Sequence, residues 1–110
     1  MPHFMFRWQF NDISAKALIT RPHDRTSNAK ALIEGCGGKL HSYYFCMGEY
    51  DGIGIVEFAD TVHAAGCSMK AASTGAFARF ETTPLLTAKE GEAAMKHAHD
   101  SKSDYKPPHA

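Results

Sequence analysis

The sequence of 110 residues predicts a single α+β domain in which strands and helices follow the order β-α-β-β-α-β. Three observations support this prediction: an alternating aromatic segment near the amino terminus, a glycine-bounded hairpin in the middle, and two segments with apolar residues at helical spacing. A chain of this length can bury one hydrophobic core but not two. We therefore expect one domain over residues 1–98 and a polar tail over residues 99–110.

Residues 3–10 alternate between large apolar side chains and other residues, which is the period of a strand. The apolar positions are Phe4, Phe6, Trp8 and Phe10. Asn11 and Asp12 can accept hydrogen bonds from free helix amides, so a short helix is expected over residues 13–19. It must stop before Pro22, which in turn suits the first turn of a second helix.

The second helix carries apolar residues at i, i+3, i+4 and i+7, which form one stripe that is expected to cover the sheet. These residues are Ala29, Leu32, Ile33 and Cys36. Gly37 and Gly38 can end this helix in the left-handed conformation. An aromatic-rich strand over residues 39–47, a turn over 48–52 and a strand over 53–58 then form an antiparallel hairpin.

A third helix is expected to start at a cap formed by Asp60 or Thr61 and to end near Ser73. Its inner stripe is expected to be mostly small, which lets the helix lie close to the sheet. The residues of this stripe are Val62, Ala65, Gly66, Met69 and Ala72.

The last strand is expected over residues 76–86, and Pro84, which cannot donate to a ladder, places it at an edge. Thr87 and Glu90 form a capping box in which each side chain can accept a hydrogen bond from a free amide. A last helix should therefore follow and end near His97.

This order of elements is typical of a ferredoxin-like fold, a four-stranded antiparallel sheet with the first and third strands in the centre and both long helices on one face. In the later strands, both alternating sets of positions contain large apolar side chains, so one layer of helices cannot cover both faces. Two identical chains can cover the remaining face with the same patch used twice. We therefore expect a homodimer through the sheet faces, that is, a dimeric α/β barrel.

Several motifs of the sequence resemble the GYD domain family over roughly residues 3–88. They are Gly37-Gly38-Lys39-Leu40, Tyr44-Phe45, Gly48-Glu49-Tyr50-Asp51, Ile55-Val56-Glu57 and Arg79-x-Glu81-Thr82. Gly48, Tyr50 and Asp51 match the motif that names the family, and they are expected to fix the hairpin. The resemblance implies the fold and dimer of the dimeric α/β barrels, whose relatives include cofactor-free monooxygenases, muconolactone isomerases, polyketide cyclases and haem-handling enzymes. It implies no single reaction.

Glu57 is the leading candidate for chemistry, because a carboxylate in an apolar strand must face water at a rim or be desolvated beside a partner. Inside a cleft its pKa would rise, and with a tyrosine it could abstract a proton beside a carbonyl. Tyr44 shares the face of Glu57 if the hairpin loop has an even residue count, and Tyr43 does so if the count is odd. His41, one strand away, could shuttle a proton, although an exposed edge-strand histidine is the commoner case.

The alternative role of Glu57 is structural, as a hydrogen-bonded pair with a tyrosine, Arg7 or Arg79. Aromatic side chains of the first two strands are candidates for the wall of a ligand pocket, with a core or dimer interface as the alternative. The candidate ligand-binding residues are Phe6, Trp8, Tyr43 and Arg79.

Composition excludes several classes of partner. Twelve basic and twelve acidic side chains cancel without a run of either sign, so neither nucleic acid nor a membrane surface is expected. No apolar stretch reaches the roughly 18 to 20 residues of a membrane span, and the amino terminus lacks a secretory pattern, so the expected location is the cytoplasm. The three cysteines are expected to be reduced and unpaired.

No motif implies a cofactor, and no metal site is expected, because His97 and His99 diverge at a helix end and no second pair completes a tetrahedron. The expected function is a dimeric module that binds a small hydrophobic or aromatic ligand or serves as a structural partner. The alternative is a cofactor-independent isomerase, cyclase or monooxygenase that acts on a small hydrophobic carbonyl or aromatic compound. That enzyme would use Glu57 with a tyrosine in a pocket between sheet and helices.

Overall fold

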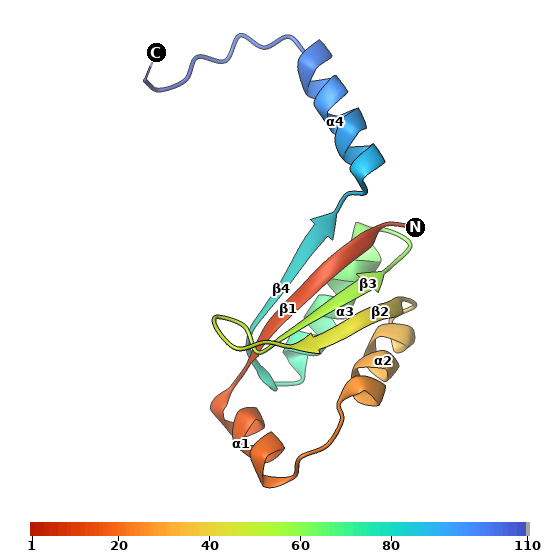
Figure 1. The fold of residues 1–110 in the computed structure, drawn as a ribbon, viewed down its shortest axis with the longest axis vertical. Helices are drawn as coiled ribbons and strands as arrows, with labels where there is room; N and C mark the ends of the chain where they lie inside the picture. Colours follow the sequence, from red (N-terminus) through yellow and green to blue (C-terminus); the bar gives the residue numbers. More distant parts are fainter. Residues whose placement is uncertain (110) are drawn as a thin grey trace.

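The computed structural model describes residues 1–109, in which four segments form one antiparallel sheet (Figure 1). The strands are β1 (His3–Phe10), β2 (Lys39–Phe45), β3 (Gly52–Glu57) and β4 (Phe77–Leu85). Their order across the sheet is β2-β3-β1-β4, so the first and third strands are central. This arrangement confirms the predicted ferredoxin-like α+β fold and its hairpin between β2 and β3.

Two of the four helices cover the sheet. The helices are α1 (Asp12–Thr20), α2 (Thr26–Gly35), α3 (Thr61–Ser73) and α4 (Ala88–Asp100). α2 packs against β2 and α3 against β4, on the same face of the sheet, whereas α1 lies beyond one end of the sheet (Figure 1). None of the helices within residues 1–109 is long and apolar enough to cross a membrane.

Three helix starts follow the predicted capping residues. Asn11 and Asp60 each accept a hydrogen bond from the backbone amide three residues later, at 2.9 Å. Thr87 and Glu90 form the complete capping box at the start of α4. Each cap satisfies amides that have no partner within the helix, which is why these positions mark the boundaries.

The start of α2 corrects the sequence prediction. Pro22 does not lie in the first turn, because the helix begins at Thr26. The carboxylate of Asp24 accepts a hydrogen bond from the amide of Thr26 at 2.8 Å. This local turn begins α2 at a position closer to its apolar stripe than Pro22 is.

The core lies between the sheet and the two covering helices. Its members are Phe4, Phe6, Trp8, Ile33, Val56, Phe58, Ala64, Cys67 and Ala71. The aromatic residues of β1 all point into this layer, as their alternation predicted. Phe58 is fully buried and packs between the rings of Phe4 and Phe6.

The buried stripe of α3 differs from the predicted one. Ala64, Cys67 and Ala71 are buried, whereas Val62 and Met69 are 77% and 71% exposed. The two stripes are about one residue apart around the helix, and both consist largely of small side chains, so the periodicity alone fits either of them. The fully buried Phe58 ring lies in the same core, where small helical side chains leave it room.

Two glycines are required by close contacts with aromatic rings. A Cβ atom on Gly52 would lie 2.3 Å from Cε2 of Trp8, and one on Gly38 would lie 2.4 Å from Cε1 of Phe58. Both distances are shorter than any real van der Waals contact. Glycine at the start of β3 therefore allows the indole ring of Trp8 to pack directly against the backbone of this strand.

α4 and the tail extend away from the domain (Figure 1). No residue of α4 is buried. The radius of gyration is 17.6 Å, whereas a compact chain of this length has about 13 Å. The core of the β-α-β-β-α-β unit is thus complete without α4.

Candidate functional site

A cavity of about 370 Å³ lies between the sheet and the covering helices. Most of its wall is aromatic, and the aromatic residues are Phe6, Trp8, Phe10, Tyr43, Phe77 and Phe80. Leu32 and Ile33 of α2 close it from the helix side. Arg25, Asn28 and Thr74 add the polar groups of the lining. An apolar pocket with few polar groups is typical of a site for a small organic molecule.

Trp8 is the central side chain of the aromatic wall. Its ring centroid lies 5.5 Å from that of Tyr43 and 6.1 Å from that of Phe80. Its Nε1 is buried and donates to no acceptor within residues 1–109. An unpaired buried donor costs about 1–3 kcal/mol.

Tyr43 and Arg25 are the polar groups of the lining that can carry charge. Burial raises the pKa of the Tyr43 phenol, while the nearby Arg25 opposes this shift. The phenol is therefore protonated at neutral pH and can donate a hydrogen bond. The guanidinium of Arg25 can bind a carboxylate or a carbonyl oxygen.

The opposite face of the sheet carries no helix within residues 1–109, and we refer to it as the open face. Strand alternation places on it His3, Met5, Arg7, Gln9, Ile53, Ile55 and Glu57. Met5, Ile53 and Ile55 are half-buried and lie between two polar clusters. The open face therefore has an apolar centre with a charged group of residues toward each end.

A β-bulge in β2 decides which side chains of this strand reach the open face. Leu40 lies opposite Val56 and Ser42 lies opposite Ile55, so His41 is the extra residue. As a result, Leu40 packs against the core, while His41 points to the open face. Without the extra residue, the alternation would have placed Leu40 on the open face instead.

His3, His41 and Glu57 form the first polar cluster of the open face. Nε2 of His41 lies 2.8 Å from Oε1 of Glu57, and Nε2 of His3 lies 3.7 Å from the same oxygen. The two imidazole rings are stacked, with centroids 4.9 Å apart. The hydrogen bond from His41 and the proximity of His3 lower the pKa of Glu57 in spite of partial desolvation. Glu57 is thus a carboxylate at neutral pH and not a base with a raised pKa.

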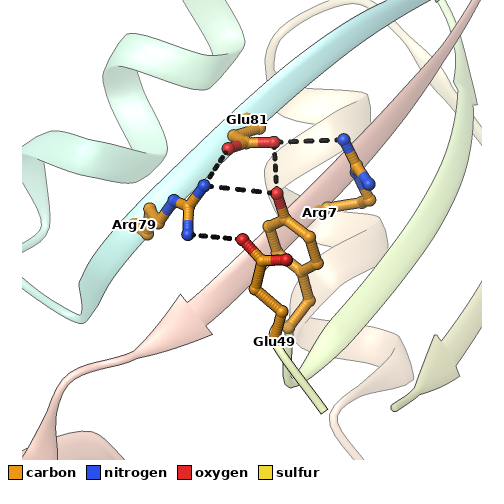
Figure 2. A network of polar contacts seen from close by, with 5 residues as sticks. Arg7, Glu49, Arg79 and Glu81 are labelled. Carbon is orange, nitrogen blue, oxygen red and sulfur yellow. Dashed lines mark hydrogen bonds and ion pairs between the residues drawn. The ribbon is translucent and has the colours of Figure 1, made fainter. Parts of the chain in front are cut away.

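The second polar cluster joins β1, β4 and the hairpin loop (Figure 2). Glu81 accepts hydrogen bonds from Arg7 at 3.1 Å, from the Tyr50 hydroxyl at 2.6 Å and from Arg79 at 2.8 Å. Arg79 also donates to Glu49 at 3.0 Å. The guanidinium of Arg7 lies 4.4 Å from the centre of the Tyr50 ring. The two arginines and two glutamates of this cluster therefore compensate each other.

The turn motif connects the hairpin loop to β1. Oδ2 of Asp51 accepts a hydrogen bond from the amide of Phe10 at 2.8 Å, and the Asp51 amide donates to the Trp8 carbonyl at 2.8 Å. Tyr50 reaches Glu81 on β4. Gly48 has a positive φ of 149°, which favours glycine. The motif thus holds the loop against the central and edge strands, beyond fixing the hairpin itself.

The structure separates the residues that the sequence placed in one site. Phe6, Trp8 and Tyr43 line the cavity, whereas Arg79 lies on the open face. The loop of residues 46–51 has an even count, and Tyr44 accordingly lies on the face of Glu57. The expectation that Glu57 and a tyrosine converge between sheet and helices is wrong, because the alternation of β3 turns Val56 and not Glu57 toward the cavity. Tyr44 is 65% exposed and pairs with Ile53, at the other end of β3 from Glu57.

Sequence reasoning missed Arg25 and Asn28 as cavity residues. They precede or begin the apolar stripe of α2, at positions that a helical wheel assigns to its polar edge. Asn28 lies one helical turn before Leu32 and Arg25 lies two turns before it, and this spacing is the signal that could have indicated them.

The described cysteines form no disulfide, and Cys67 is buried, whereas Cys36 and Cys46 are half-buried. Burial, with a smaller contribution from neighbouring Cys36, raises the pKa of Cys67 to about 12.

We expect iodoacetamide at about pH 8 to leave Cys67 unmodified in the folded protein, since the thiolate is the reactive form. Unfolding without a reductant should expose three alkylatable thiols, as measured by mass spectrometry. Rapid labelling of Cys67 in the folded state, or fewer than three thiols after unfolding, would contradict this prediction.

Comparison with known proteins gives the family and the fold. No curated protein matches the chain. The crystal structure of MtbAldR (Rv2779c) superposes on the chain with a TM-score of 0.52 at 19% identity. The match covers 78% of this chain and 52% of the other, so the chain spans about half the length of that protein, and the similarity concerns the fold alone. The GYD domain model matches residues 4–95, and the chain therefore belongs to the GYD domain family.

Proposed function

We propose that this GYD domain protein binds a small, flat and mainly apolar molecule in the cavity between sheet and helices, as a homodimer that pairs through the open face. The observation that carries the proposal is the aromatic cavity, whose lining includes Trp8 and the hydrogen-bond donors Tyr43 and Arg25. Its volume of about 370 Å³ lies at the lower end of the roughly 300–1,000 Å³ of small-molecule sites. The ligand class is an aromatic or other planar compound with a hydrogen-bond acceptor.

The lining favours binding over catalysis. Among the described residues it contains no carboxylate and no histidine, and its ionisable groups are Tyr43 and Arg25. The phenol of Tyr43 is a weaker acid than usual because burial raises its pKa, so it is suited to donating a hydrogen bond rather than to removing a proton. A cofactor-independent enzyme in this cavity would lack the carboxylate base that the alternative function requires.

The homodimer is supported by the open face. Met5, Ile53 and Ile55 form its apolar centre, and no helix of the described chain covers them. A contiguous apolar patch on the surface of a soluble domain often marks an interface. A second copy presents the same patch, so a two-fold axis through the centre satisfies both chains at once.

The single tryptophan of the chain makes the cavity hypothesis testable by fluorescence. Mass spectrometry under native conditions would first identify ligands retained by gently purified protein, and a panel of planar aromatic acids and ketones would then be titrated against Trp8 emission. Ala29 lines the cavity from α2, so Ala29→Phe should fill part of the volume. We expect this variant to weaken binding at least about tenfold, since the phenyl ring occupies ligand space.

Ala31 provides the matched control, because it is an exposed residue of the same helix that does not line the cavity. Ala31→Phe should bind with wild-type affinity. If no panel compound or co-purified ligand changes Trp8 emission in the wild type, the proposal fails. It also fails if the Ala29 and Ala31 variants bind equally well.

A further inference from the structure

We propose that His3, His41 and Glu57 form a binding site for a divalent transition-metal ion of the zinc class on the open face. The three side chains come from β1, the bulge of β2 and the end of β3, so the sheet itself brings them together. One possible ligand atom from each residue lies within 4.8 Å of the others. The site lies on the face opposite the cavity and does not depend on the proposed ligand.

The distances suit coordination to one ion. In a tetrahedral zinc site with bonds of about 2.0–2.1 Å, neighbouring ligand atoms are about 3.3 Å apart. The distances of 2.8 Å and 3.7 Å from Oε1 of Glu57 to the two Nε2 atoms bracket this value. The side chains of His3 and His41 are 41% and 31% exposed, so small ring rotations can adjust the remaining distance without disturbing the core.

The ring of His3 uses its two nitrogens differently: Nδ1 contacts the backbone, and Nε2 faces Glu57. Nδ1 of His3 lies 3.2 Å from the carbonyl oxygen of Met1. A carbonyl only accepts hydrogen bonds, so Nδ1 carries the proton in the neutral ring and Nε2 keeps its lone pair. Such a contact from the second ring nitrogen to a backbone carbonyl is the usual support of a metal-binding histidine.

The charge balance distinguishes this cluster from the second one. In the second cluster two guanidinium groups compensate two carboxylates (Figure 2). In the first cluster, the carboxylate of Glu57 lies within 4 Å of two imidazoles and, among the described residues, of no guanidinium or ammonium group. A metal cation can therefore bind between the carboxylate and the imidazoles without displacing an ion pair with an arginine or a lysine.

The donor set indicates the class of metal. Two imidazoles and one carboxylate suit zinc, cobalt or nickel, whereas calcium and magnesium prefer oxygen ligands alone. Three protein ligands leave a coordination position for water or for a group from a second molecule. Sequence patterns contain no indication of the site, because its ligands are 38 and 16 residues apart along the chain and only the bulge turns His41 toward Glu57.

The test is a zinc titration of metal-free protein by equilibrium dialysis, with the bound metal measured by elemental analysis. We expect about one zinc ion per chain at micromolar free zinc, and cobalt should give the visible absorption of a nitrogen- and oxygen-ligated ion. His41→Ala and Glu57→Gln should each weaken zinc binding at least about tenfold, since loss of a supporting contact alone costs 10–100-fold. His3→Gln, at the first position of β1, provides a third variant if either of these fails to fold.

The control is the double variant His97→Ala/His99→Ala, which removes the exposed histidines of α4. It should bind zinc as the wild type does. The proposal is overturned if the wild type binds no more zinc than folded His41→Ala or His3→Gln. It is also overturned if the control variant is the one that loses the metal.

Discussion

Replacing Ile55 with lysine is expected to convert the proposed dimer into a monomer at micromolar concentration. Ile55 lies at the centre of the open face, where it pairs with Met5 on the neighbouring strand. An ammonium group at the apolar centre would lose its hydration between two chains, at a cost of about 3 kcal/mol or more, which is at least a hundredfold in dissociation constant. Light scattering coupled to gel filtration should therefore give the mass of one chain, 12.1 kDa, instead of twice that mass.

Val62→Lys is the matched control for this experiment. Val62 is an apolar residue on the outer side of α3 and is 77% exposed, so a lysine there remains in water. This variant should keep the mass of the wild type. A wild type that is monomeric at the same concentration, or an Ile55→Lys variant that stays dimeric, would refute pairing through the open face.

Gly52→Ala is expected to destabilise the fold by about 2 kcal/mol, within the range for an added methyl group in a packed core. The new Cβ would lie 2.3 Å from the indole of Trp8, and the neighbouring rings of Tyr43 and Phe80 limit where the indole can move. Urea unfolding followed by far-UV circular dichroism at fixed protein concentration would measure the change. Because Trp8 is part of the cavity wall, the same variant should also weaken the binding of any aromatic ligand.

Gly54→Ala, two residues further along β3, separates the steric effect from the general effect of replacing glycine in a strand. There the new Cβ has its nearest atom at 3.5 Å, an ordinary contact. Its stability should stay within about 1 kcal/mol of the wild type. Equal losses in the two variants would show that the contact with Trp8 does not explain the glycine at position 52.

The elements of the fold could be predicted because each depends on local chemistry. The aromatic alternation of β1, the caps at Asn11 and Asp60 and the capping box of α4 act within a few residues, and the structure has all of them. The face of α3 could not be predicted in the same way. Two adjacent stripes of small side chains fit its periodicity, and the core packing around Phe58 decides between them.

The candidate site was harder to predict, because it depends on which face of the sheet each strand residue occupies. The aromatic side chains of β1 and Tyr43 could be assigned to a pocket from their alternation and chemistry. Glu57 could not, since nothing in the sequence says which of its neighbours faces the helices. The bulge at His41 leaves no clear sequence signal, yet it determines that an imidazole and not Leu40 meets Glu57.

Because α4 extends away from the domain, it also affects how a thermal unfolding curve of this protein is interpreted. A helix of this length is marginal in water without tertiary contacts, so it melts gradually and outside the cooperative transition of the domain. The helical signal would then begin to fall before the emission of Trp8, which reports only on the domain. A difference between the transition temperatures of these two signals would show that α4 melts separately from the domain. A folding intermediate is not needed to explain it.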